Sequence, residues 1–550
     1  MSQRERLRDA LAGAARQLGA PEPVDPPLER PRETAHGDWS TNLAMTLARP
    51  LKRKPRDIAD DLIGKLSLSD AGVDRVEIAG PGFINFYMRA ADTAGALPAL
   101  IAADEFYGRH VIGEKRLVNI EFVSANPTGP LHVGHGRQAA LGDAIASLLE
   151  WTGWEVSREF YYNDAGAQIA NLGLSVQARL AQLAGREVGI PEGGYHGDYI
   201  SEIAERYAAE HSTDREGLNL AEVTRFAVRA MRKEQDLDLQ ALGVLFDTYC
   251  LESSLYSDGK VDETVAALIG AGHTYEHEGA LFLRTTDFGD DKDRVMRKSA
   301  GKGREFTYFL PDVAYHVTKW KRGFHRAINV QGADHHSTVT RVRAGLQALG
   351  LGVTTGYPEY VLHQMVTVMR GGQEMKISKR AGSYVTVRDL VDEVGRDAVR
   401  YFFLMRKGDS QLVFDVDLAR SQSEENPVYY IQMAHARISG IFRVGEIDPV
   451  SVTGVGVGLD VLNEPEEQQL IKALLDFPAL VAVSAEALEP HRLASYLLET
   501  ARLVHLWYHK HHVLHEPEEI TSARLVLARA ARIVLRNGVT ILGISAPDRM

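Results

Sequence analysis

The pattern of apolar and polar positions divides the chain into three parts with different secondary structure. Residues 1–88 show helical periodicity followed by two alternating segments, which predicts a small α+β domain. From residue 117 onward, short β-branched runs alternate with helical stretches, as in a parallel α/β sheet. From residue 424 apolar residues recur every three or four positions, which predicts an all-α bundle.

Each part can be divided into expected elements. The first part should contain helices at 4–18, 39–51 (with Asp38 as a plausible N-cap) and 58–66, and strands at 76–79 and 83–87 around the turn Gly80-Pro81-Gly82. The middle part should contain strands at 117–123, 156–161, 306–310 and 327–331, a hairpin at 274–284, and helices at 90–103, 138–149, 165–240, 386–394 and 397–404. The last part should contain helices at 431–442, 466–475, 493–505 and 522–537. The carboxyl ends of the parallel strands should form the ligand crevice.

The stretch Val118–Arg137 carries the strongest chemical signal. A buried-looking strand is followed by a polar turn that contains two prolines and Gly129, and then by a helix start with His132, Gly134 and His135. This geometry receives anions, because free backbone N–H groups and the positive end of the helix dipole face the ligand. The two imidazoles could donate hydrogen bonds to an α-phosphate, and Gly134 leaves room for a flat adenine. The tetrapeptide alone is equally typical of surface or capping histidines.

A second signal lies downstream, in the sequence Met375-Lys-Ile-Ser-Lys-Arg380. Lys376 and Lys379 stand on an expected loop with glycines on both sides, at positions 371, 372 and 382. A mobile loop suits positive charge that has to arrive at a transition state. Each lysine alone would most simply be a surface lysine.

Together the two signals resemble the HIGH and KMSKS signatures of class I aminoacyl-tRNA synthetases. Within that class, four stretches resemble arginyl-tRNA synthetase: Ser124-Ala-Asn-Pro-Thr-Gly-Pro-Leu-His-Val-Gly-His135, Phe288-Gly-Asp-Asp-Lys-Asp-Arg-Val295, Gly332-Ala-Asp-His-His336 and Asn426-Pro-Val-Tyr-Tyr-Ile-Gln-Met-Ala-His-Ala-Arg437. The resemblance runs from about His36 to the last residue. Ile377 and Arg380 depart from the commoner Met and Ser.

The resemblance implies a fold class and a function. The fold is α/β: a class I Rossmann-like parallel-sheet catalytic domain with helical insertions, a small N-terminal α+β domain and a C-terminal all-α bundle. The expected regions are an N-terminal tRNA-contacting domain (1–88), a connecting helix and linker (89–115), the catalytic domain with insertions (116–370), a lysine-loop and stem-contact region (371–423), and an anticodon-binding domain (424–550). The implied activity is ATP-dependent attachment of L-arginine to tRNA(Arg) through an arginyl adenylate, by a monomer.

The resemblance also assigns residues to the active site. His132, His135, Lys376 and Lys379 would be catalytic, and ATP would contact these four together with Gly134, Gly332, Asp334 and Ser378, with Mg²⁺ held mainly by the nucleotide phosphates and water. Arginine would contact Ser124 and Asn126 at its α-amino side, and Glu252, Tyr308 and Asp312 at its guanidinium, which pairs well with carboxylates. Asp312 alone would be explained as a helix N-cap after Pro311. Glu121 looks buried in an apolar strand, so its charge needs a partner.

The tRNA contacts implied by the family are spread over both ends of the chain. The candidates are Phe83, Asn85, Tyr430, Arg437, Tyr508 and Met550, because splayed bases stack on aromatic faces and pair with arginine. The alternative is that tyrosines and tryptophans of the bundle belong to its core, and for Trp507 we favour this alternative. Met433 stands where some relatives carry an aromatic residue.

Composition narrows the class of protein. The chain has 550 residues, 45% of them hydrophobic and 25% charged, which indicates a soluble protein of three or four domains. The net charge of −12 argues only weakly against nucleic acid, because basic clusters occur locally, as around Arg53 and Lys54. A single cysteine, Cys250, excludes an internal disulfide and a multi-cysteine zinc site, so no structural zinc or other metal site is expected. With neither an apolar leader nor a membrane-length run, we expect a cytoplasmic protein without membrane contact.

Two other functions share part of this sequence pattern. A small-molecule nucleotidyltransferase also uses HxGH on a Rossmann-like sheet, but it would need neither the N-terminal domain nor the helical C-terminal third. An inactive RNA-binding paralogue would not need the two histidines and two lysines, all of which are present.

Overall fold

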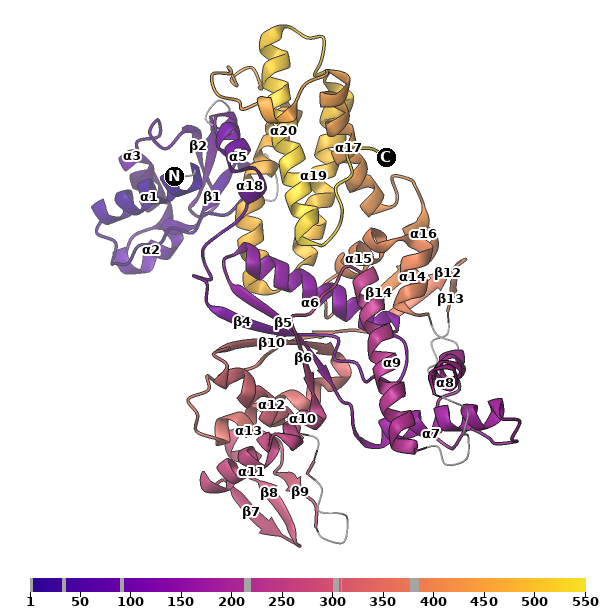
Figure 1. Cartoon of the computed structure of the whole chain (residues 1–550). Coiled ribbons are helices and arrows are strands. Elements are labelled where there is room, and N and C mark those ends of the chain that lie inside the picture. The colour runs from indigo at the N-terminus through magenta and orange to yellow at the C-terminus, as the bar shows by residue number, and fades with distance from the viewer. Residues whose placement is uncertain are drawn as a thin grey trace. The chain divides into compact units, whose positions relative to one another are not determined.

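A computed structural model describes residues 3–31, 36–89, 93–211, 219–299, 306–307, 309–375 and 385–550 (Figure 1). The chain forms two compact units, each built from segments that are distant in sequence. One unit comprises Met1–Tyr107, Arg437–Asp476 and Arg502–Val534, and the other comprises Gly108–Ala436, Phe477–Ala501 and Leu535–Met550. Within the described residues, no helix is long and apolar enough to cross a membrane.

The second unit is built on a five-stranded parallel sheet. Its strands, in the order β11-β10-β4-β5-β6, are β11 (Glu359–His363), β10 (Arg326–Gly332), β4 (Leu117–Glu121), β5 (Glu155–Tyr162) and β6 (Thr248–Leu251). The chain leaves β4 in one direction and returns on its other side at β10, so β4 and β10 flank the topological switch point where open α/β sheets bind ligands. Figure 1 shows α6 (Val133–Trp151) on one side of this sheet and α12 (Phe309–Lys321) and α13 (His336–Ala348) on the other. The predicted parallel α/β architecture is confirmed.

The expected strand at 306–310 is wrong. Phe306 makes only an isolated bridge with Arg297, and Phe309 begins α12. Phe309, Val313 and Val317 are buried at helical spacing along α12. Pro311 is tolerated in the first turn of a helix, where its missing N–H has no partner to lose.

Two insertions lie between the strands; the first has a core of its own, whereas the second shares its core with α12 and α13. The first consists of α7 (Gly166–Leu183), α8 (Asp198–Glu210) and α9 (Leu220–Ala241), as the helical pattern of residues 165–240 predicts. The second consists of α10 (Glu252–Ser257), α11 (Lys260–Gly270) and an antiparallel sheet of β7 (Thr274–His277), β8 (Ala280–Leu283) and β9 (Arg294–Arg297).

After the main sheet come β12 (Val366–Arg370), β13 (Gln373–Glu374), α14 (Val387–Val394), α15 (Arg396–Leu404), β14 (Leu412–Asp415) and α16 (Val416–Arg420).

The N-terminal part of the first unit is a small α+β fold. Helices α1 (Gln3–Gln17), α2 (Leu43–Leu51) and α3 (Pro55–Lys65) pack on a sheet with the order β1-β3-β2, made of β1 (Trp39–Thr41), β3 (Phe83–Met88) and β2 (Val73–Ala79), and α5 (Leu97–Ala103) follows.

The expected helix at 39–51 begins too early, and Asp38 is not its N-cap. Trp39, Ser40 and Thr41 pair with β3 as a strand, and Asn42 occupies the cap position of α2. The Asp38 carboxylate instead accepts a hydrogen bond from the Met88 N–H at 2.7 Å and forms an ion pair with Lys472.

The C-terminal helices are α17 (Pro427–Val444), α18 (Pro465–Ala487), α19 (His491–Lys510) and α20 (Glu518–Ile541), and all four are longer than the periodicity predicts. Their apolar faces are buried along most of their length, with Trp507 fully buried as a core residue. The expected all-α bundle is therefore confirmed.

Candidate active site

Helix α6 begins at the two histidines themselves, five residues before the expected Gln138. His132 is its N-cap: the His132 Nδ1 accepts hydrogen bonds from the Gly134 N–H at 3.1 Å and the His135 N–H at 3.4 Å. In return the His135 Nδ1 accepts from the His132 N–H at 3.4 Å, which completes a capping box. The two rings stack with their centroids 3.7 Å apart and an interplanar angle of 15°.

The cap decides which ring nitrogen of each histidine carries the proton. Because both Nδ1 atoms accept backbone hydrogen bonds, each neutral imidazole is protonated at Nε2. The capping and the phosphate-binding interpretations of these histidines are therefore compatible, since the cap orients an Nε2–H donor on each ring. Gly134 fits closely beneath this arrangement, because a Cβ there would lie 2.9 Å from the His132 Cε1.

The backbone between β4 and α6 is strained where the sequence predicts ligand contacts. Val123 (φ +67°) and Ser124 (φ +40°) both adopt left-handed conformations, which are costly for residues with a Cβ. The Ser124 Oγ donates to the Glu121 Oε1 at 3.0 Å and accepts from the Tyr161 N–H at 3.2 Å, so the hydroxyl is held between two strands. The Asn126 amide donates to the Gln168 Oε1 at 2.7 Å.

Three carboxylates converge at the carboxyl ends of β4 and β6 and the first turn of α12. Glu121 has the partner that its burial demands: the fully buried Lys319 Nζ lies 2.8 Å from its Oε2. Glu252 begins α10 and accepts a hydrogen bond from the Tyr161 hydroxyl at 2.9 Å. Asp312 lies in the first turn of α12 and is partly buried. The sequence indicated that Glu121 needs a partner, because it stands in an apolar strand, but it did not identify Lys319. Nothing in the sequence indicated that Tyr161 contacts the site.

The electrostatics of this cluster favour a bound cation. Burial, together with the charges of Glu121 and Glu252, raises the pKa of the Asp312 carboxyl to about 7. Burial also raises the pKa of Glu252, against the lowering effect of its hydrogen bond from Tyr161. A guanidinium placed between Asp312 and Glu252 would supply the opposite charge that lowers the pKa of both carboxyls.

Two of the residues predicted to contact ATP, Gly332 and Asp334, lie at the end of β10. Gly332 pairs with His363 across the sheet and leads into Asp334, whose side chain is largely exposed. A Cβ on Gly332 would lie 2.4 Å from the Asp334 Oδ1, so the glycine allows the carboxylate to fold back over the strand end. Burial lowers the pKa of His363 to about 4, so this ring is neutral at physiological pH.

Four of the predicted site residues lie outside the described residues: Tyr308, Lys376, Ser378 and Lys379. On either side of the lysine stretch, the described segments are held by backbone hydrogen bonds. The Met375 N–H donates to the Val368 carbonyl at 2.9 Å, and the Val387 N–H donates to the Leu131 carbonyl at 2.8 Å. Thr386 also forms a bridge with His132, so the chain after the lysine stretch lies beside the two histidines.

The candidate tRNA contacts fall into both units. In the first unit, Phe83 is 40% exposed, whereas Asn85 is buried and accepts a hydrogen bond from the Ser40 hydroxyl. Arg437 donates to the His505 Nδ1 at 2.7 Å, and its guanidinium lies 6.0 Å from the ring centroid of the exposed Tyr508.

The remaining two tRNA candidates belong to the second unit. Tyr430 is partly buried on α17, and Met550 is 52% exposed. Met550 lines a pocket of about 710 Å³ together with Arg396, Tyr429 and Gln432.

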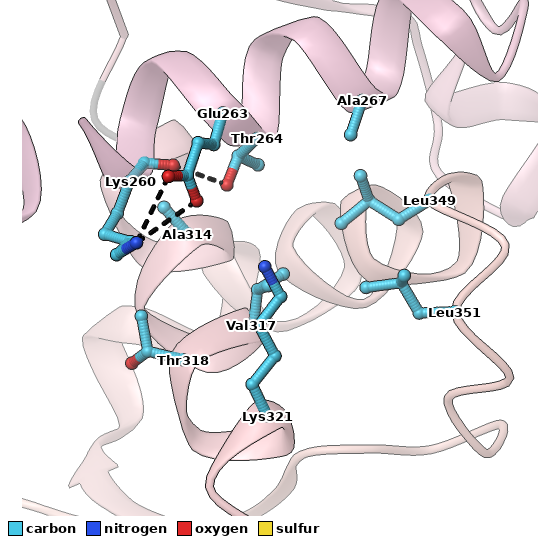
Figure 2. A pocket seen from close by; sticks show the side chains of 10 residues that line it. All are labelled: Lys260, Glu263, Thr264, Ala267, Ala314, Val317, Thr318, Lys321, Leu349 and Leu351. Atoms are coloured by element: carbon cyan, nitrogen blue, oxygen red, sulfur yellow. Dashed lines mark hydrogen bonds and ion pairs between the residues drawn. The ribbon is translucent and has the colours of Figure 1, made fainter.

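A separate small pocket does not belong to this site. Figure 2 shows that it lies between α11, α12 and the Leu349–Leu351 segment, with Lys260 paired to Glu263 at its rim. Its volume of about 200 Å³ is below the usual range for substrate sites, and most of its lining is apolar. It contains none of the predicted site residues.

Comparison with known proteins gives matches over almost the whole chain. Three family models match: arginyl tRNA synthetase N terminal domain over residues 4–88, tRNA synthetases class I (R), catalytic domain, over residues 96–438, and DALR anticodon binding domain over residues 431–550. The parallel sheet with HxGH at the start of α6 therefore defines a class I aminoacyl-tRNA synthetase. Within that class, the chain belongs to the arginyl-tRNA synthetase family.

Individual relatives support the same assignment. The chain is 55% identical over 536 residues to the arginine–tRNA ligase of Geotalea daltonii, covering 95% of this chain and 94% of the relative. It is 51% identical to the arginine–tRNA ligase of Bordetella parapertussis, with both chains covered completely. The Thermus thermophilus arginyl-tRNA synthetase structure shares the fold with a TM-score of 0.76 at 24% identity, over 100% of both chains.

Proposed function

We propose that this chain activates L-arginine with ATP at the carboxyl edge of its parallel sheet and transfers the arginyl group to tRNA(Arg). The observation that carries the proposal is the juxtaposition of an oriented histidine pair with a carboxylate cluster. His132 and His135 stand at the start of α6, the element that follows β4 along the chain, and Glu121 ends β4. Burial and the charge of Glu121 raise the pKa of Asp312, which supports an anion-binding end and a cation-binding end that adjoin each other.

In the activation step, an arginine carboxylate oxygen attacks the α-phosphorus of ATP, a P–O bond forms, and the bond to the leaving pyrophosphate breaks. Negative charge accumulates on the α-phosphate and on the leaving group, so fixed donors aimed at these positions stabilise the transition state. The Nε2–H groups of His132 and His135 would serve the α-phosphate. Lys376 and Lys379 would stabilise the leaving pyrophosphate, because Thr386, a few residues after them, pairs with His132. Mg²⁺ would arrive on the triphosphate, held by phosphate oxygens and water.

The nucleotide and the amino acid would bind at opposite sides of the histidine pair. Gly134, Gly332, Asp334 and Ser378 would contact the adenosine and phosphates. Asp312, Tyr308 and Glu252 would bind the guanidinium. Ser124 and Asn126 would position the α-amino group, which requires the strained loop that Glu121 holds through Ser124.

tRNA would be bound by residues from both units. Phe83 and Asn85 in the N-terminal domain, and Tyr430, Arg437, Tyr508 and Met550 in the helical region, are the proposed contacts. Exposure of Phe83, Tyr508 and Met550 supports stacking on bases, whereas burial of Asn85 makes an indirect role through Ser40 the simpler one. We further propose that the protein acts as a monomer in the cytoplasm.

ATP–pyrophosphate exchange tests the proposal directly. With tRNA(Arg) present, the purified protein should exchange label between pyrophosphate and ATP with arginine and with no other standard amino acid; parallel assays without tRNA(Arg) show whether activation needs bound tRNA. Exchange that is independent of arginine, or that prefers another amino acid, would refute it. A small-molecule nucleotidyltransferase would show exchange that none of the twenty amino acids stimulates.

A further inference from the structure

The last residues of the chain belong to the same compact unit as the catalytic sheet, and one buried arginine holds them there. Arg400 of α15 is fully buried. Its Nε donates to the Leu542 carbonyl at 2.8 Å, its Nη1 to the Leu242 carbonyl at 3.2 Å, and its Nη2 to the Asp143 Oδ2 at 2.6 Å. These partners come from the C-terminal segment, the end of α9 and the middle of α6. Arg400 therefore joins three parts of the chain at one point.

The partner in α6 connects this point to the histidine pair. Asp143 lies eight residues after His135 on the same helix, or about 12 Å along its axis at 1.5 Å per residue. Its carboxylate also accepts a hydrogen bond from the Arg158 Nε of β5 at 3.0 Å. The helix is packed closely on the end of β4, since a Cβ at Gly142 would lie 2.2 Å from the Phe122 Cγ. In so dense an interior, a shift at Asp143 is transmitted along the helix rather than absorbed.

The C-terminal segment lies directly against the Arg400 guanidinium. Gly543 has φ +68°, and a Cβ there would lie 2.2 Å from the Arg400 Nη2. The same helix α15 holds the segment at a second point. The Asp397 Oδ2 accepts from the Ser545 N–H at 3.2 Å and from the Gln432 Nε2 at 2.8 Å. Two side chains of one helix thus fix the backbone of residues 542–545.

We propose that Arg400 is a positioning residue for adenylate formation, and that the C-terminal segment 542–545 is the support that fixes it. This segment lies within the match to the anticodon-binding domain model, so part of that region would also serve the chemical step. The proposal rests on the proposed function of His132 and His135. It assigns a role in the rate of activation to residues that contact neither ATP nor arginine.

Gly543→Ala tests the proposal by changing the C-terminal segment and leaving the proposed active-site residues unchanged. The added methyl group would press on the guanidinium and displace Arg400 and Asp143. We expect kcat for arginine-dependent pyrophosphate exchange, measured with saturating tRNA(Arg), to fall by about 10- to 100-fold, while KM for ATP and for arginine changes much less. Gly350→Ala is the matched control, because Gly350 has a similar φ of +63° with no atom within 4 Å of the added Cβ. It should keep kcat near the wild-type value.

Arg400→Lys provides a second, independent variant. Lysine keeps a positive charge for Asp143, but its single nitrogen cannot occupy the three separate positions from which Nε, Nη1 and Nη2 of Arg400 donate. It should reproduce the selective loss of kcat, with tRNA affinity from filter binding unchanged within about twofold. A reduced kcat at a temperature well below Tm, with unchanged tRNA affinity, would support the proposal.

Three results would overturn the proposal. These are an unchanged kcat in both folded variants, a loss confined to KM or tRNA affinity, and an equal loss in Gly350→Ala. If Gly543→Ala does not fold, Arg400→Lys alone decides. Absence of arginine-dependent exchange in the wild-type protein would instead refute the proposed function, which the same experiment shows separately.

Discussion

Two helices, α6 and α12, place their N-terminal ends at the proposed active site, and they are held there in different ways. At α6 the capping hydrogen bonds of His132 and His135 join residues at most three positions apart, so the local sequence builds the oriented pair. At α12 the pKa of Asp312 is raised by burial and by the charges of Glu121 from β4 and Glu252 from α10, which are distant in sequence. Anion recognition therefore rests on local structure in this site, and cation recognition rests on the tertiary fold.

The largest expected effect is at α12, where Asp312 depends on residues from distant parts of the chain. Asp312→Ala should lower kcat/KM for arginine by roughly two to three orders of magnitude, because removing one member of a desolvated ion pair typically costs about 3–5 kcal/mol. Asp312→Asn keeps the shape but not the charge and should be nearly as damaging, while KM for ATP moves far less. Steady-state aminoacylation kinetics provide the measurement.

A matched control is available for Asp312 in the neighbouring helix. Asp262 also occupies the first turn of a helix, α11, but it is exposed and lies outside the site. Asp262→Asn should leave arginine kinetics unchanged. Normal charging by Asp312→Asn would show that Asp312 is only a helix-start residue, and Glu252 would become the next residue to replace.

At α6, where the contacts are local, we expect a smaller loss of activity, and it should appear in kcat. Asparagine is a good N-cap, so His132→Asn should keep the start of α6 while removing the Nε2–H donor. We expect kcat for pyrophosphate exchange to fall by about 10²-fold, the usual effect of removing one transition-state donor, with little change in KM for arginine. Wild-type kcat in this variant would leave His132 with a capping role alone.

The same contrast explains how much the sequence could predict. The strand–turn–helix around His132 was predictable, because its contacts are local and its apolar pattern is regular. The strand expected at 306–310 was wrong, because a short aromatic and apolar run fits a strand as well as the first turn of α12. Lys319 could be expected only as an unnamed partner for Glu121, since nothing in its own surroundings distinguishes it from a surface lysine. The joint between Arg400, Asp143 and Leu542 spans more than half of the chain and has no sequence signal.

A third prediction concerns the pH dependence of arginine use. The guanidinium needs an ionised Asp312, whose pKa in the free protein is about 7. Below that pH a growing fraction of the protein holds a proton there, so KM for arginine should rise by up to about tenfold per pH unit as the pH falls below 7, and should be flat above it. In Asp312→Asn this dependence should disappear. A flat profile in the wild-type protein down to about pH 5 would contradict the assignment.

The stability of the protein should show the opposite trend from arginine binding. Folding raises the pKa of Asp312, so the folded chain holds this proton more tightly than the unfolded chain does. The contribution of Asp312 to stability is therefore complete below its unfolded pKa and is lost as the pH rises through about 7. The Tm of Asp312→Asn relative to wild type should accordingly increase between acidic and mildly alkaline pH, as measured by differential scanning calorimetry without arginine. Saturating arginine should narrow the difference at alkaline pH, because the bound guanidinium stabilises the ionised carboxylate of the wild type.

The smallest expected effect separates the two roles of His132 from each other. His132→Ala and His132→Asn both lack the imidazole donor, so their kcat values should be similar. Only alanine also lacks a side-chain acceptor for the N–H groups of Gly134 and His135, which the His132 Nδ1 satisfies in the wild type. Loss of an N-cap typically costs about 1 kcal/mol, so His132→Ala should be less stable than His132→Asn by about that amount in urea unfolding. Equal stability would mean that the start of α6 is fixed by packing against the sheet rather than by its cap, and the contrast between local and tertiary control would then no longer hold at α6.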